Sequence, residues 1–145
     1  MKIPKTKEEF LEEFYKSFDL YDKIGIQRVN QFIRILPKVS DALIIESFIE
    51  IFKNKERKEF ELFEQRIIGE VLKDLNLKSN LDIDFILRET VFGWNKSAYE
   101  FPFWLKKNYG ISALTKAIKD FESTTTCEIE KDKLNTFKYW LRIKD

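Results

Sequence analysis

Residues 91–110 read VFGWNKSAYEFPFWLKKNYG, and this stretch decides how the rest of the chain is interpreted. It holds seven of the aromatic residues, namely Phe92, Trp94, Tyr99, Phe101, Phe103, Trp104 and Tyr109. Large rings bury more apolar area per residue than other side chains. A stretch this aromatic must therefore either turn into a core or meet a partner.

The same stretch contains its own helix boundaries. Gly93 ends the preceding helical pattern, and Pro102 suits the first turn of a new helix, where its missing N–H costs nothing. We therefore expect a connection over 94–99 and a helix over 102–109. Ser97 and Glu100 also form a capping box, but a helix begun at Ser97 would place Pro102 too deep. We favour the later start.

Apolar residues elsewhere repeat at helical spacing. A first helix is expected after the Thr6–Glu9 capping box, a second from Asp22 to a stop at Pro37, and a third from Ser40 or Asp41. Further helices are expected over 60–75, 81–92, 112–121 and 128–141. Residues 53–58 (KNKERK) and 123–127 (STTTC) are expected to be breaks. Residues 81–87 alternate in a way that also suits a strand, but a lone strand has no partner, so a helix is preferred.

These patterns predict an all-α fold. We expect one domain over 1–145, built as a compact bundle of about seven or eight helices packed as hairpins. The hairpins break near 38, 78 and 111, a rough period of 35–40 residues that leaves HEAT-like stacking as the alternative. No known repeat signature accompanies this period.

Composition excludes most common chemistry. The chain has no histidine, and its one cysteine, Cys127, has no neighbouring base to activate it and no second cysteine to bind zinc. There is no G-x-S-x-G, P-loop or G-x-G-x-x-G motif. We expect no cofactor, no metal and no membrane span, and the lone thiol favours a cytoplasmic location.

Carboxylates are the remaining candidates for a site. Glu46 and Glu50 lie four residues apart on the third expected helix, where they form a narrow polar strip. A solvated strip, an ion pair with Arg28 or Arg34, an anionic patch that binds a partner, and an acid–base pair all fit this spacing.

Charge gives little support to nucleic-acid binding. The formal net charge is +1, and acidic residues interrupt the two basic clusters, which lie over 53–58 and 131–144. Lys138 and Arg142 share a face of the last helix and could follow a phosphate backbone. On the fourth helix, Glu61, Glu64 and Glu70 form an acidic outer face of the kind that immunity proteins present to basic toxins.

We conclude that the sequence favours a non-enzymatic protein-binding module, with a toxin-neutralising, immunity-like role ranked first. A nucleic-acid-associated protein using the basic C-terminal helix and an enzyme using paired carboxylates are the alternatives. The expected partner-binding residues are Trp94, Lys96, Tyr99, Phe101, Glu46 and Glu50. The loop over 94–99 has a second interpretation, in which it folds back to cover the core. Phe103, Trp104 and Leu105 are expected to supply core contacts.

Overall fold

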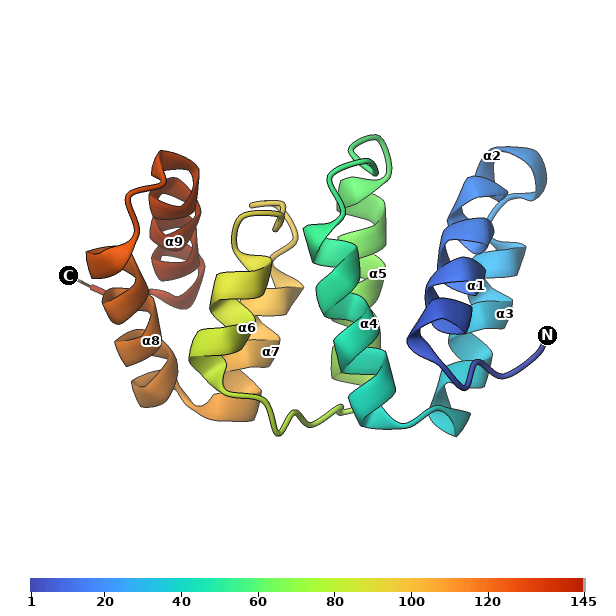
Figure 1. The fold of residues 1–145 in the computed structure, drawn as a ribbon, viewed down its shortest axis with the longest axis horizontal. Coiled ribbons are helices and arrows are strands. Elements are labelled where there is room, and N and C mark those ends of the chain that lie inside the picture. Colours follow the sequence, from blue (N-terminus) through green and yellow to red (C-terminus); the bar gives the residue numbers. More distant parts are fainter. Residues whose placement is uncertain (145) are drawn as a thin grey trace. The chain divides into compact units, whose positions relative to one another are not determined.

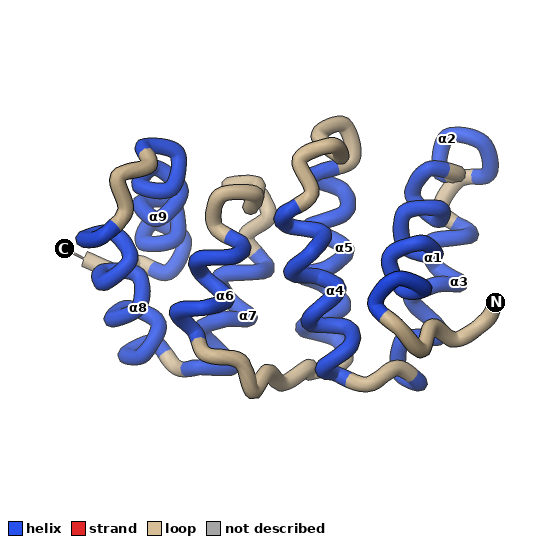
Figure 2. Tube along the Cα trace, viewed as in Figure 1, coloured by secondary structure: helices blue, strands red, loops and turns tan. Residues whose placement is uncertain are grey.

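The computed structural model describes residues 1–144, and within them the chain is all-helical, with no strand (Figure 2). This confirms the predicted fold class, including a helix rather than a strand after residue 82. The elements are α1 (Lys7–Asp19), α2 (Tyr21–Ile24), α3 (Gln27–Ile35), the 3-10 turn η1 (Leu36–Lys38), α4 (Asp41–Lys53), α5 (Glu61–Asp74), α6 (Ile83–Thr90), α7 (Glu100–Tyr109), α8 (Ile111–Thr124) and α9 (Glu128–Leu141).

The chain divides into two compact units, the first from Met1 to Ile51 and the second from Phe52 onward. This division does not test the prediction of a single domain. In the first unit, α1 and α3 lie antiparallel and in contact, with α2 at the turn between them (Figure 1).

A cluster of phenylalanines forms the core of the first unit. The ring of Phe10 meets the rings of Phe32 and Phe48 edge-on, with centroids 5.1 and 5.8 Å apart. Phe14, one turn further along α1, makes the same kind of contact with Phe32 at 5.9 Å. These rings share one face of α1 because residues four apart in a helix lie above one another.

The second unit is built from α5–α9. Helices α5, α7 and α9 contact one another in series, while α6 contacts α8, so the two sets form two layers (Figure 1). Whether these layers amount to HEAT-like stacking stays a prediction.

Several helix boundaries differ from the predicted ones. Gly25, at φ 69°, splits the expected second helix into α2 and α3, because this left-handed conformation favours glycine. Helix α6 starts after Asp82, whose side chain accepts from the Asp84 amide at 2.8 Å, and not at Leu81. Helix α8 follows Gly110 without a side-chain cap and runs from Ile111 to Thr124, so it starts one residue earlier and ends three residues later than the predicted 112–121.

Helix α7 starts at Glu100, between the two predicted starts. Pro102 is then its third residue, and the first-turn amides of a helix have no partner within the helix, so proline fits there. The earlier start also changes which rings face inward. Phe101, Trp104 and Leu105 share the buried face at i, i+3 and i+4, while Phe103 turns outward and is 42% exposed. The prediction that Phe103 belongs to the core is therefore wrong.

Candidate functional site: an aromatic face on α7 and α9

The connection between α6 and α7 folds back into the second unit. The Trp94 side chain is completely buried, packs on Phe137 with centroids 4.4 Å apart, and donates its indole N–H to the Ala98 carbonyl at 2.9 Å. Phe101 is also buried, against Phe52 at 4.6 Å. Neither ring has surface to offer a partner, which agrees with the second interpretation of this loop, in which it folds back to cover the core, and not with the interpretation of Trp94 as an exposed anchor. The Trp94 indole N–H has its hydrogen-bond partner inside the unit, and the apolar surfaces of both rings are buried there.

A buried glutamine on α5 holds one side of this connection. The side chain of Gln65 donates to the Gly93 carbonyl at 2.8 Å and accepts from the Asn95 amide at 2.6 Å. The Asn95 side chain in turn donates to Glu61 at 2.9 Å. Gly93 is required here, because a Cβ at this position would lie 1.7 Å from the Phe52 carbonyl oxygen. The backbone of the connection is thus tied directly to α5.

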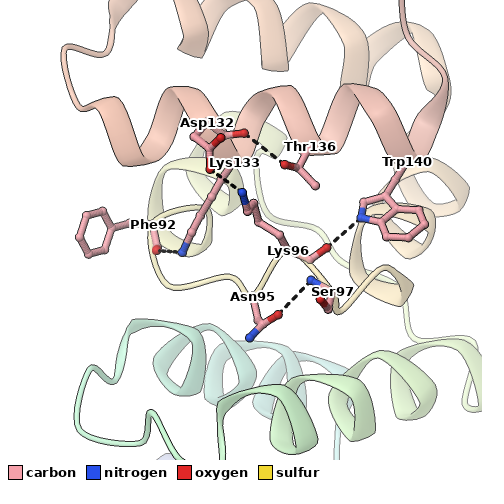
Figure 3. A network of polar contacts seen from close by, with 8 residues as sticks. All are labelled: Phe92, Asn95, Lys96, Ser97, Asp132, Lys133, Thr136 and Trp140. Atoms are coloured by element: carbon pink, nitrogen blue, oxygen red, sulfur yellow. Dashed lines mark hydrogen bonds and ion pairs between the residues drawn. The ribbon is translucent and has the colours of Figure 1, made fainter.

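Helix α9 holds the other side (Figure 3). The Trp140 indole donates to the Lys96 carbonyl at 2.9 Å, and the Lys96 ammonium binds Asp132 at 2.7 Å. The Lys133 ammonium donates to the Phe92 carbonyl, and burial lowers the pKa of this lysine below its ordinary value of 10.5. Lys96 is therefore exposed but already paired, and its carbonyl has a structural role.

Four rings remain at the surface beside this network. We call them the aromatic face: Tyr99, Phe103, Tyr139 and Trp140. Tyr99 stands between Phe103 and Trp140, with centroids 6.2 and 5.4 Å apart, and Tyr139 lies 5.5 Å from Trp140. Tyr139 is 74% exposed and Tyr99 is 38% exposed. The rings come from α9, from α7 and from the residue that precedes α7.

Two open hollows flank the aromatic face and share Tyr99 and Phe103. The hollow between α7 and α9, of about 800 Å³, is also lined by Lys106, Tyr139, Trp140, Leu141 and Arg142. The hollow between α5 and α7, of about 510 Å³, is lined by both signs of charge: Arg66, Lys73 and Lys107, with Glu70, Asp74 and Glu100. Arg66 binds Glu100 at 3.2 Å and lies over the Tyr99 ring at 5.5 Å. Among the described residues, charge is therefore unequal across the face, because the hollow beside α9 is lined by two cations and no carboxylate.

The predicted carboxylate strip lies on α4 in the first unit, where Glu46 is exposed and Glu50 is half-buried. Arg28, one of the two arginines considered as partners of this strip, binds Glu13 at 2.8 Å. It does so because α1 lies against α3 and presents Glu13 to it.

Two predicted charged surfaces are also wrong. Glu64 is buried on α5 and binds Arg57 at 2.5 Å, so the acidic outer face is not formed. Lys138 is buried and binds Glu122 on α8 at 2.6 Å, so it does not share an exposed strip with Arg142. Long charged side chains can turn inward wherever a partner is available, and the spacing along one helix does not show that partner.

Part of the aromatic face was missed by the sequence-based reasoning. Neither Trp140 nor Tyr139 was among the predicted partner-binding residues. A signal was present: Leu134, Phe137 and Leu141 define the buried face of α9, and Tyr139 falls outside their spacing.

Comparisons with known proteins return nothing: no family model, curated protein or solved structure matches this chain. Among residues 1–144, no group of three or more Cys, Asp or Glu side chains is arranged to hold a metal ion. None of the described helices has the length and apolar character needed to cross a bilayer.

Proposed function

We propose that this chain is a non-enzymatic protein-binding module whose contact surface is the aromatic face. The observation that carries the proposal is the pair formed by Tyr139 and Trp140. Tyr139 is 74% exposed, and its neighbour Trp140 is held in place by a hydrogen bond to the Lys96 carbonyl. Tyrosine and tryptophan are the residues most enriched at binding hot spots, and fixed rings lose little conformational freedom on binding.

A comparison of protein variants tests this proposal. The full chain is used to capture partners from an extract after chemical crosslinking, in parallel with Tyr139→Ala and Phe85→Ala. Phe85 is the matched control, because it is an exposed ring on α6 outside the aromatic face. We expect the same partner to be captured by the unchanged chain and by Phe85→Ala, and lost with Tyr139→Ala. A partner captured equally by all three proteins would assign binding elsewhere.

The more specific role, neutralisation of a toxin in the manner of immunity proteins, is part of this proposal. It rests on the small helical chain and on the missing catalytic motifs. We further propose a cytoplasmic location, on the basis of the single unpaired thiol of Cys127. Growth of cells that carry a candidate toxin, with and without this chain, tests neutralisation directly: equal killing in both cases would contradict it.

A further inference from the structure

The charge beside the aromatic face defines the chemistry of its partner, given the protein-binding function proposed above. We infer that the hollow between α7 and α9 binds an acidic peptide segment that carries an apolar side chain. Lys106 from α7 and Arg142 at the end of α9 line this hollow, and no carboxylate of residues 1–144 does. Within the part of the chain that the structure describes, neither cation takes part in an ion pair. A hollow lined by two cations is complementary to carboxylates.

The rings provide the second part of the recognition. Phe103, Tyr99 and Trp140 form a continuous apolar floor, with neighbouring centroids 6.2 and 5.4 Å apart. An aliphatic or aromatic side chain placed on this floor would bury rings that are now in contact with water. An acidic residue a few positions away on the same segment would then reach Lys106 or Arg142. This combination resembles the way helical and extended peptides use one apolar anchor and flanking charges.

The neighbouring hollow limits where the acidic residues can lie. The side between α5 and α7 is lined by three carboxylates, of Glu70, Asp74 and Glu100, and by three cations, of Arg66, Lys73 and Lys107, and Arg66 is bound by Glu100. Carboxylates of a partner would meet charges of both signs there, so they would be attracted more strongly to the two cations on the α9 side. The aromatic face therefore selects the orientation of the segment as well as its charge.

A single-stranded nucleic acid is the other anionic ligand that uses rings and cations. It is less well matched, because it needs a row of cations along its backbone, and here the two cations beside α9 are followed by a hollow that three carboxylates line together with three cations. Binding measurements with a peptide and with an oligonucleotide can separate the two ligands.

The test is selection of a displayed random peptide library on the immobilised full chain. We expect enriched peptides to combine Asp or Glu with an apolar residue. Binding of an enriched peptide should weaken at least about tenfold with Lys106→Glu/Arg142→Glu and with Tyr139→Ala, and it should be unchanged with Phe85→Ala. It should also weaken as salt is raised. Selection on Lys106→Glu/Arg142→Glu should enrich basic peptides instead.

Three results would overturn the inference, and they have different meanings. Enriched peptides that are neutral or basic, yet lose binding with Tyr139→Ala, would overturn the assigned chemistry while the proposed protein-binding face stands. Peptides that bind all variants equally, or no enrichment at all, would overturn both. Binding of a fluorescent 20-nucleotide oligouridine that depends on Tyr139 and exceeds that of any enriched peptide would assign the face to nucleic acid.

Discussion

Gly69 on α5 lies directly beneath Glu100 on α7, so closely that a Cβ added to the glycine would stand 2.4 Å from the Cβ of Glu100. Side-chain carbons do not approach this closely, so the contact between the two helices depends on the missing methyl group. The same contact places Glu100 within reach of Arg66, one turn before Gly69 on α5. The position of Tyr99, which precedes Glu100, is set by it too.

We predict that Gly69→Ala lowers the free energy of unfolding. Alanine gains about 1 kcal/mol of helix propensity over glycine, but overpacking a close helix contact typically costs about 1–3 kcal/mol. Chemical denaturation should show a net loss, and the larger Gly69→Val a greater one. Glu70→Ala, at the exposed neighbouring position, serves as the control and should stay within about 0.5 kcal/mol of the unchanged chain. A Gly69→Ala variant as stable as the original would show that the helices separate without cost.

Trp94→Ala should destabilise the protein strongly. The change removes a fully buried ring and its hydrogen bond to Ala98, and truncations of this kind cost about 3–5 kcal/mol. Tyr139→Ala should change stability by less than about 0.5 kcal/mol, since that ring is mostly exposed. Thermal unfolding of the two variants measures the difference. Equal melting temperatures would contradict the placement of the two rings.

Replacing Gln65 with leucine should destabilise the connection between α6 and α7. The Gly93 carbonyl and the Asn95 amide would lose their partner, and each buried unsatisfied group costs about 1–3 kcal/mol. Hydrogen exchange should then speed up selectively at Asn95. Gln31→Leu, at an exposed position of α3, is the matched control and should leave both measurements unchanged.

Removing one partner of the buried ion pair of Arg57 and Glu64 should lower the free energy of unfolding more than replacing both residues with apolar ones. The Glu64 side chain is 1% exposed, and Arg57→Ala would leave its carboxylate without this partner, at a cost of about 3–5 kcal/mol. The double variant Arg57→Met/Glu64→Leu should be the more stable of the two, because it leaves no buried charge. Lys116→Ala, which breaks the exposed pair with Asp120, should lower the free energy of unfolding far less than Arg57→Ala does, because solvent screens that pair. A double variant less stable than Arg57→Ala would refute this reasoning.

Tyr109 should make the protein less stable in alkali. Burial raises the pKa of its hydroxyl above the ordinary value of 10.0, and the hydroxyl donates to the Leu81 carbonyl at 2.7 Å. From pH 10 upward the unfolded chain loses this proton while the folded chain keeps it, so stability falls with rising pH. Tyr109→Phe should flatten this fall in unfolding measurements at pH 9, 10 and 11. Tyr139→Phe, which changes an exposed hydroxyl, should keep the slope of the original.

The helical fold could be predicted from the sequence because it depends on local spacing. The apolar periodicity of 60–75 and the Thr6 cap, which accepts from the Glu9 amide at 3.1 Å, both appear in the structure. Residues close in sequence determine such features, so no distant partner has to be known.

The candidate site could be predicted only in part, because its features depend on distant residues. Tyr99 was predicted at the surface, and it lies there. The loop that holds Trp94 was left with two interpretations, because the burial of Trp94 depends on Phe137 and on the attachment of the connection to Gln65, about thirty residues earlier in the chain. Lys138 was misplaced because Glu122 lies on another helix. Phe103 was misplaced because a shift of two residues in the start of α7 rotates which rings face inward.

The three indole N–H groups have a consequence for spectroscopy. Each donates to a backbone carbonyl at 2.9 Å: Trp94 to Ala98, Trp104 to Leu77 and Trp140 to Lys96. In a nitrogen–proton correlation spectrum they should give three separate side-chain signals from three different surroundings. The Trp94 signal reports on the loop before α7, the Trp104 signal on the chain that follows α5, and the Trp140 signal on the surface rings. A ligand on those rings should move the Trp140 signal and leave the other two in place, so the native tryptophans already form a set of residue-specific reporters.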